Sequence, residues 1–326
     1  MMNVVMIIPT GIGAEIGGHA GDGTAAARLL ASVSDILIVH PNVVNASDIN
    51  EMTSNMWYVE GSILDRFLSN EVNLKPVKVN KILVATNPPI DHNLVNSVSA
   101  ARATLGLDAS IVVLNTPLRM IASKANDGSA TGEVIGWREL ANQVSNYRFD
   151  ALAISSIIEV EKEVARDYMT NGGVNPWGGV EAKASKLIAN VLGKPVAHAP
   201  IESEIFNDFK DIVDPRLSAE CVSVSYIHCV LKGLHKAPRI GGNFSVDEVD
   251  CLVSPDNCYG FPHKACERRG IPVIVVRENK TCLSNKMPDD FIFVENYLEA
   301  VGVIVSMKEG IDLSSIRRPI KFTKIT

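Results

Sequence analysis

The stretch VVMIIPTGIGAEIGGHAGDGTAAARLLAS, residues 4–32, joins an apolar run to a glycine-rich loop and then to a segment rich in alanine and leucine. The run VVMII is typical of a buried strand, and AAARLLAS is typical of a helix. Between them, residues 11–23 contain six glycines together with Glu15, His19 and Asp22. A strand that passes through such a loop into a helix predicts the first unit of an open, parallel α/β sheet.

The same alternation of apolar runs and helical stretches continues along the chain. It predicts strands at 4–8, 36–39, 82–85, 111–114, 151–154, 195–198, 251–253 and 273–276, and helices at 22–32, 92–105, 137–146, 179–192, 216–234, 259–269 and 296–308. We therefore expect an α/β fold with two lobes of mostly parallel, Rossmann-like sheets covered by helices, and a ligand crevice at the carboxyl ends of the strands. The glycine-bearing segment 123–136 predicts a boundary between an N-terminal lobe, 1–125, which holds the glycine-rich loop, and a C-terminal lobe, 126–326.

The composition argues against a nucleic-acid-binding, secreted or membrane-spanning protein. The chain has 326 residues, is 46% hydrophobic and carries a net charge of -6 without a basic run, so nucleic acid is not an expected partner. The start MMNVVMIIP is short and lacks a basic flank, which indicates a buried strand rather than a signal peptide or membrane span. We expect a cytoplasmic or plastid protein with no membrane partner and reduced cysteines, and leave open whether it is a homo-oligomer.

Polar residues follow the predicted strands, several of them beside proline, which holds the backbone in a fixed direction. The second strand runs into His40 and Asn42, the third into Asn87 and the fourth into Asn115. Because parallel strands deliver their carboxyl ends to a common edge, we expect these residues and the glycine-rich loop to converge on one crevice. A strand-stopping role explains any single one of them equally well.

The spacing of the glycines argues against two common phosphate-binding loops. It differs from the dinucleotide pattern G-x-G-x-x-G, and the second strand ends in His40 rather than an acidic residue, so a nicotinamide cofactor is not expected. The loop also lacks the lysine of a nucleoside triphosphate loop. What remains is a run of accessible amides that could hold a phosphate or carboxylate at a helix N-terminus. The identity of any cofactor stays open.

The candidate catalytic residues are His19, His40, Glu15 and Asp22. A histidine in an accessible loop titrates near neutrality and suits acid–base chemistry. Glu15, His19 and Asp22 are also metal-ligand types, but the glycines between them disfavour a helix that would align them, so no metal site is predicted. Asp22 serves equally well as a helix N-cap.

Further candidates come from three later segments. TNGGVNPWGGVEA (170–182) is a second glycine-to-helix entrance, SYIHCVLKGLHKAPRI (225–240) places Lys232 on a cationic helix face, and Arg277 follows a buried strand where Glu278 could pair with it. Cys258, before a helix start, is an alternative thiol nucleophile. The predicted substrate-binding residues are Gly11, Gly13, Gly17, Gly18, Asn42, Asn87, Asn115, Asn171, Asn175, Gly178, Gly179, Glu181, His198, Lys232, Cys258, Arg277, Glu278 and Asn279.

Five motifs together resemble one family of bacterial and plastid proteins. They are GIGAEIGGHAGD (11–22), HPNVVN (40–45), NGGVNPWGGVEA (171–182), HCVLKGLHKAP (228–238) and GIPVIVVREN (270–279). Their combination is similar to domain of unknown function family 3326, and the resemblance covers nearly the whole chain. It implies a shared site and a cytoplasmic or plastid setting, but it brings no activity with it.

These observations predict an enzyme that acts on a small anionic metabolite, a carboxylate or phosphate, by acid–base chemistry. A hydrolase, a lyase and an isomerase all fit. The alternative is a non-catalytic metabolite-binding or regulatory protein that uses the same loops only to recognise its ligand.

Overall fold

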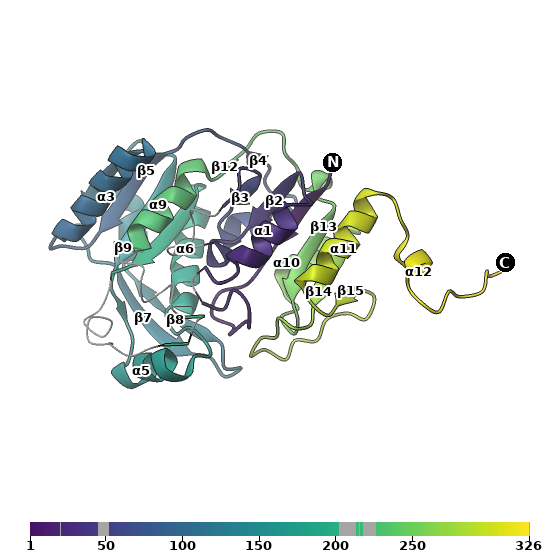
Figure 1. Ribbon diagram of the computed structural model, residues 1–326. Coiled ribbons are helices and arrows are strands. Elements are labelled where there is room, and N and C mark those ends of the chain that lie inside the picture. The colour runs from purple at the N-terminus through teal and green to yellow at the C-terminus, as the bar shows by residue number, and fades with distance from the viewer. Residues whose placement is uncertain (20, 45–51, 202–212, 215, 218–225, 326) are drawn as a thin grey trace.

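The computed structural model describes residues 1–19, 21–44, 52–201, 213–214, 216–217 and 226–325. Two parallel sheets lie side by side (Figure 1). The six-stranded sheet has the order β15 (Ile292–Val294), β14 (Val273–Val276), β13 (Cys251–Pro255), β1 (Asn3–Met6), β2 (Ile36–Val39) and β3 (Met56–Tyr58). The four-stranded sheet has the order β11 (Val196–Pro200), β9 (Ala151–Ser156), β5 (Lys81–Thr86) and β6 (Asp108–Val113). The expected α/β fold with open, mostly parallel sheets is confirmed.

The remaining strands of the described residues form two smaller sheets. The antiparallel hairpin of β7 (Arg119–Lys124) and β8 (Ala130–Ile135) is joined by β10 (Ile158–Glu159), which runs parallel to β7. The short strands β4 (Leu74–Lys75) and β12 (Arg239–Ile240) pair where the chain passes from one large sheet to the other and back. All eight predicted strands are present, whereas the sequence reading missed β3, β15 and these smaller sheets.

Helices cover both faces of the large sheets. They are α1 (Thr24–Ala31), α2 (Gly61–Leu68), α3 (His92–Leu105), α4 (Trp137–Val144), α5 (Lys162–Asn171), α6 (Gly178–Leu192), α9 (Tyr226–Lys236), α10 (Phe261–Arg269), α11 (Tyr297–Lys308) and α12 (Leu313–Ile316), with 3-10 turns at Pro41–Val43 and Val246–Glu248. The helix predicted at 216–234 lies partly outside the described residues, and its described part is α9. No helix within the described ranges is long and apolar enough to cross a membrane.

One apolar core runs across the same face of both large sheets. Side chains alternate along β1, so that Val4 and Met6 join this core while Val5 joins a second core on the opposite face under α2 and α10. The shared core packs under α1, α3, α9 and α11, which Figure 1 shows on the face toward the viewer. Helix α9 contacts β3 of one sheet and β9 and β11 of the other, so it joins the two sheets directly.

The two large sheets do not divide the chain at residue 125. That position lies in the turn of the β7–β8 hairpin. The six-stranded sheet takes three strands from the first sixty residues and three from residues after 250, while the four-stranded sheet lies between them in sequence. The predicted halves 1–125 and 126–326 therefore do not match the sheets, because the glycines of segment 123–136 serve a hairpin rather than a linker.

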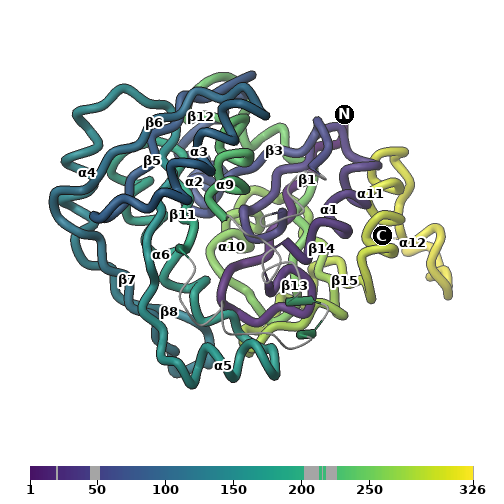
Figure 2. The backbone as a smooth tube through the Cα atoms, turned by 60° about the vertical axis from the view of Figure 1, so that its left-hand side comes forward, coloured from purple at the N-terminus to yellow at the C-terminus, as the bar shows by residue number. Residues whose placement is uncertain are grey.

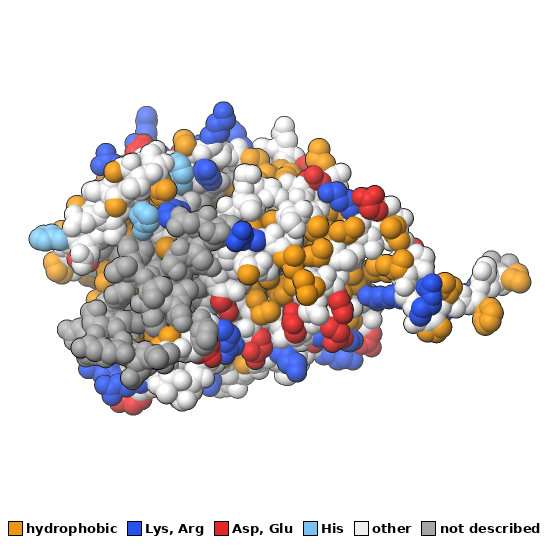
Figure 3. All heavy atoms as spheres, in the orientation of Figure 1, with side chains coloured by type: hydrophobic (Ala, Val, Ile, Leu, Met, Phe, Trp, Pro, Cys, Tyr) orange, Lys and Arg blue, Asp and Glu red, His pale blue; other side chains and the backbone are white. Residues whose placement is uncertain are grey.

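The surface shows one feature that stands apart from the sheets. Residues after α12 extend away from the body, with Ile320, Phe322 and Ile325 exposed between basic side chains (Figure 3). The N-terminal strand, in contrast, is completely buried in the middle of its sheet, as the sequence predicts.

Glycine residues allow the backbone of the glycine-rich loop to touch the backbones of β8 and of the start of α6. The amide of Ala130 donates a hydrogen bond to the carbonyl of Gly11 at 2.7 Å. A Cβ on Gly179 would lie 2.1 Å from the Ala130 carbonyl oxygen, and a Cβ on Gly178 would lie 2.4 Å from the Thr10 methyl carbon. Figure 2 shows the purple glycine-rich loop between the teal hairpin region and the green β13 region, consistent with these contacts. The loop thus joins the six-stranded sheet to β8 and the start of α6.

This contact predicts that Gly179→Ala destabilises the protein by about 2 kcal/mol or more, because the methyl group meets backbone that cannot move aside cheaply. Gly302→Ala is the matched control, since the space over helical Gly302 is open within 4 Å and alanine favours helix. Urea unfolding followed by circular dichroism measures both changes. Equal stability of the two variants would show that the close approach contributes nothing.

Candidate functional site

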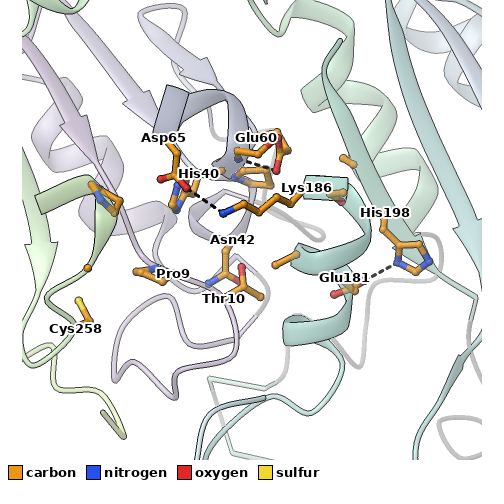
Figure 4. A pocket seen from close by; sticks show the side chains of 18 of the residues that line it. Pro9, Thr10, His40, Asn42, Glu60, Asp65, Glu181, Lys186, His198 and Cys258 are labelled. Carbon is orange, nitrogen blue, oxygen red and sulfur yellow. Dashed lines mark hydrogen bonds and ion pairs between the residues drawn. The ribbon is translucent and has the colours of Figure 1, made fainter. Parts of the chain in front are cut away.

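A cavity of about 430 Å³ lies where the six-stranded sheet meets α6 and β11 (Figure 4). Its walls come from the carboxyl ends of β1, β2 and β3, the loop after β13, the first turns of α2 and α6, and β11. The predicted site residues His40, Asn42, Glu181, His198 and Cys258 line it. It lies at the strand carboxyl ends, where ligands bind in open α/β sheets.

His40 follows β2 and is held by Pro41 at the first position of a 3-10 turn. Its Nδ1 lies 3.4 Å from the carbonyl oxygen of Ile8, and its Nε2 is buried without a hydrogen-bond partner among the described residues. Burial lowers the pKa of His40 to about 4, so the ring is neutral at pH 7. When Nδ1–H donates a hydrogen bond to the Ile8 carbonyl, Nε2 carries a lone pair beside the cavity and can accept a proton.

Tyr58, the last residue of β3, lines the same cavity and its hydroxyl is also buried without a partner in the described part of the chain. Burial raises the pKa of Tyr58, so the phenol keeps its proton at every physiological pH. Buried polar groups are normally hydrogen-bonded, and two orphaned groups at one cavity indicate that a ligand or water completes them.

Glu181 and His198 form the opposite wall. The Nδ1 of His198 lies 2.8 Å from Glu181 Oε1, and its Nε2 lies 2.9 Å from the hydroxyl oxygen of Ser156. The His198 side chain is fully buried, whereas the Glu181 side chain is 23% exposed. Because Nδ1–H donates to the carboxylate, Nε2 accepts from the Ser156 hydroxyl. This chain of hydrogen bonds fixes the orientation of the Glu181 carboxylate at the cavity.

The remaining charged groups come from α2 and α6. Glu60 caps α2 by accepting hydrogen bonds from the amides of Ser62 and Ile63, and burial raises its pKa. Burial also raises the pKa of Asp65, against the effect of Lys186, whose Nζ lies 3.5 Å away. The cavity lining therefore holds the carboxyls of Glu60, Asp65 and Glu181, and the ammonium of Lys186.

Cys258 is not an activated thiol. Burial raises its pKa to about 11, and its sulfur donates to the carbonyl of Pro255 at 3.3 Å. His263 lies nearby, but its Nδ1 accepts from the amide of Gly260, so its Nε2–H donates to Ser254 rather than removing a proton from the thiol. The burial of Cys258 gives no support to the alternative of a thiolate nucleophile, because burial opposes the effect of the dipole of the helix that follows.

The glycine-rich loop is held by protein groups. The side-chain amide of Asn279 accepts from the amide of Ile16 and donates to its carbonyl, each at 2.9 Å, and Asn42 donates to the Gly17 carbonyl. Protein atoms also occupy the space over Gly11, Gly13, Gly17, Gly18, Gly178 and Gly179. Close packing of protein atoms explains the choice of glycine at these positions, and the phosphate cradle stays a prediction.

The trio of Glu15, His19 and Asp22 does not line the cavity within the described residues. Glu15 forms an ion pair with Arg216 at 2.9 Å, and Asp22 accepts a hydrogen bond from the His19 amide. The His19 ring meets the Tyr168 hydroxyl, and burial, with Arg216 nearby, lowers its pKa to about 4. Across the described chain no three His, Cys, Asp or Glu side chains are grouped as metal ligands.

Several other predicted residues lie elsewhere, so the expected convergence of the glycine-rich loop, His40, Asn87 and Asn115 on one crevice is wrong. Asn87 and Asn115 belong to the four-stranded sheet, where the Asn87 side chain bonds both backbone groups of Leu118. Arg277 pairs with Glu295 at 2.6 Å rather than with Glu278, whose carboxylate accepts from the Tyr297 amide. Asn171 bonds Asp167 and Asn175 caps the start of α6, while Lys232 lines a second cavity.

The sequence reading missed Tyr58, Glu60, Lys186 and Ser156 as members of the site. Tyr58 ends β3 and Glu60 follows it, and this strand of three residues, Met56–Tyr58, is too short for a periodic signal. Ser156 is the last residue of β9, and nothing in the sequence pairs it with His198 forty-two residues later. Lys186 lies five residues after Glu181 on α6, outside the three- and four-residue spacings that place side chains together on a helix, so no local pattern links the two.

Comparison with known proteins places the chain in a family. The family described as "Protein of unknown function (DUF3326)" matches residues 3–317. The chain belongs to this family. It is also 35% identical over 335 residues to a protein of Synechococcus sp. (strain ATCC 27144 / PCC 6301 / SAUG 1402/1) named an uncharacterized lipoprotein, covering 96% of this chain and 92% of that protein. No solved structure matches. The resemblance inferred from the five motifs is confirmed.

The buried neutral state of His40 predicts a pH-dependent stability. Its pKa is depressed to about 4 in the folded protein, so between pH 6.5 and 4 the unfolded chain binds more protons and stability falls as pH falls. The full difference corresponds to on the order of 3 kcal/mol. His40→Asn, which keeps a donor toward Ile8, should flatten the decline of unfolding free energy between pH 7 and 4.5. His92→Asn, at an exposed imidazole, should leave it unchanged; identical slopes for all three proteins would contradict a neutral, buried His40.

Proposed function

We propose that the protein is an enzyme that uses acid–base chemistry on a small polar metabolite bound in the cavity between the two sheets. The observation that carries the proposal is His40, a neutral buried histidine whose Nε2 has no partner within the described chain and which lines a cavity. A free imidazole nitrogen in such a place is costly to leave unpaired, and a proton-bearing substrate group satisfies it.

The residues around His40 fit complementary roles. His40 Nε2 accepts a proton from the substrate, and the Tyr58 phenol, whose pKa burial raises, keeps its proton and can donate a hydrogen bond or proton to the group that gains charge. The Glu181 carboxylate orients the substrate or balances a positive charge. These roles suit an isomerase, a lyase or a hydrolase, and they need neither a nicotinamide cofactor nor a thiolate.

The Ser156–His198–Glu181 chain supports positioning rather than nucleophilic attack by serine. In a serine hydrolase the hydroxyl faces the substrate and the carboxylate is buried behind the histidine. Here the order is reversed, because Ser156 is 1% exposed and Glu181 is the partly exposed end. Ser156 and His198 are therefore positioning residues that hold the carboxylate in one orientation.

The charges of the lining argue for a substrate that is neutral or cationic. Three carboxyls face one ammonium, and that ammonium already lies against Asp65. Hydroxyl and amino groups are matched to this lining, whereas a phosphate or carboxylate would meet like charge. This proposal replaces the anionic substrate predicted from the sequence.

A cytoplasmic location remains part of the proposal. The cysteines of the described residues, Cys229, Cys251, Cys258, Cys266 and Cys282, are free thiols, which fits a reducing compartment and supports this part of the proposal. The word lipoprotein belongs to the name of the cyanobacterial relative. Fractionation of the native host tests the location, and recovery of the protein with membranes would contradict it.

The activity is tested by incubating the purified protein with a mixture of neutral and cationic small metabolites and following each compound by mass spectrometry. The wild type should convert a compound that His40→Asn converts about 100-fold more slowly or worse, because a general base contributes that much. Tyr58→Phe and Glu181→Gln should also be impaired. Arg277→Gln is the control, as Arg277 pairs with Glu295 outside the cavity lining.

Binding is measured in parallel with turnover. A compound that the wild type retains in equilibrium dialysis without converting it would replace the enzyme by the non-catalytic binding protein. Equal turnover by His40→Asn and the wild type would remove His40 from the chemistry.

A further inference from the structure

A second cavity, of about 340 Å³, lies on the other side of Tyr58 from the first. It is formed by residues 52–58, by Pro76 and Val77, and by the last turns of α9. Its nitrogen-bearing side chains that can be cationic are Lys232, His235 and Lys236, and no carboxylate belongs to its lining in the part of the chain that the structure describes. The sign of its charge is thus opposite to that of the first cavity.

His235 is a buried polar group of this cavity, which distinguishes the cavity from a cluster of exposed lysines. The residue is only 8% exposed, and its Nδ1 is buried without a hydrogen-bond partner among the described residues. An orphaned polar atom beside a cavity indicates a missing partner. Burial lowers the pKa of His235, and the positive charge of Lys236 acts in the same direction. A bound anion would oppose both effects and interact favourably with Lys236.

The end of α9 does not repel an anion as a bare helix C-terminus would. The side-chain amide of Asn80 donates to the carbonyls of Leu234 and Ala237, each at 2.8 Å, and its backbone amide donates to the carbonyl of His235. These hydrogen bonds satisfy carbonyl groups whose partial negative charge would otherwise face the cavity.

The rest of the lining is apolar. Met52, Met56, Leu105 and Pro238 contribute to it, and Met56, with Met52 and Leu105 packed against it, belongs to the apolar core that also contains Leu234 of α9. An apolar wall beside cationic groups suits a ligand that is charged at one end and apolar at the other.

We propose that this second cavity binds a small organic anion, with its carboxylate or phosphate beside His235 and Lys236 and its apolar part against Met56 and Leu105. The site does not depend on the proposed chemistry at His40. Tyr58 lines both cavities, and the backbone of Gly233 lies against its ring, so substitutions there would disturb both sites. The test therefore leaves Tyr58 unchanged.

The probes are phenyl phosphate and benzoate, with phenol as the neutral comparison, each titrated into the full chain by isothermal calorimetry. The wild type should bind at least one of the two anions and bind phenol at least tenfold more weakly. Lys236→Gln and His235→Phe should each weaken binding of the anion roughly tenfold, the effect of losing one charge-assisted hydrogen bond. Lys308→Gln, at the equivalent last-turn position of α11, is the matched control and should bind like the wild type.

Thermal melts show that each variant is folded before it is titrated. The proposal is overturned if neither anion binds the wild type at millimolar concentration, if phenol binds equally well, or if both substitutions at the end of α9 leave the affinity unchanged. His40→Asn should bind the anions normally, so loss of activity in that variant and loss of anion binding here are separate results.

Discussion

The close backbone contact of the glycine-rich loop with β8 and the start of α6 is the constraint on which the rest of the structure depends. Gly11 from the six-stranded side meets Ala130 and Gly179 from the other, with the amide of Ala130 bonded to the Gly11 carbonyl at 2.7 Å. This contact sets where α6 begins relative to β1 and β2. The cavity exists because Glu181 and Lys186 on α6 are thereby held beside His40 and Asp65.

Burial, more than direct charge pairing, sets the chemistry of the cavity. It keeps His40 neutral and Tyr58 protonated, and it raises the pKa values of Glu60 and Cys258. A neutral imidazole that can accept a hydrogen bond and a phenol that can donate one are therefore present at the same pH, while the Cys258 thiol keeps its proton. Evidence that the groups serve a ligand rather than the fold comes from the two atoms left unpaired, since core polar groups normally find protein partners.

The sequence predicted the parallel strands, His40 after a strand and Glu181 in the first turn of a helix, because apolar runs and their polar successors are local features. His198, expected at the end of its strand, lies inside β11. It did not predict that the last strands pair with the first, as in the register of Val4 with Cys251, because that pairing joins segments far apart in the chain. For the same reason Asn87 was expected in the cavity and Tyr58 was not. Composition alone does not separate two interpretations of the glycines, because a loop packed against another backbone has the same composition as one that cradles an anion.

Filling the cavity without altering its chemical groups tests the account most directly. Gly61 lines the cavity, and a Cβ added to it would meet only His40 Nε2, at an ordinary contact distance of 3.6 Å. Native mass spectrometry of wild type and Gly61→Leu, after incubation with the same metabolite mixture, measures which compounds each protein retains. The account predicts that Gly61→Leu melts at the wild-type temperature and no longer retains the compound that the wild type binds. Unchanged retention by a folded Gly61→Leu would contradict the assignment of this cavity as the functional site.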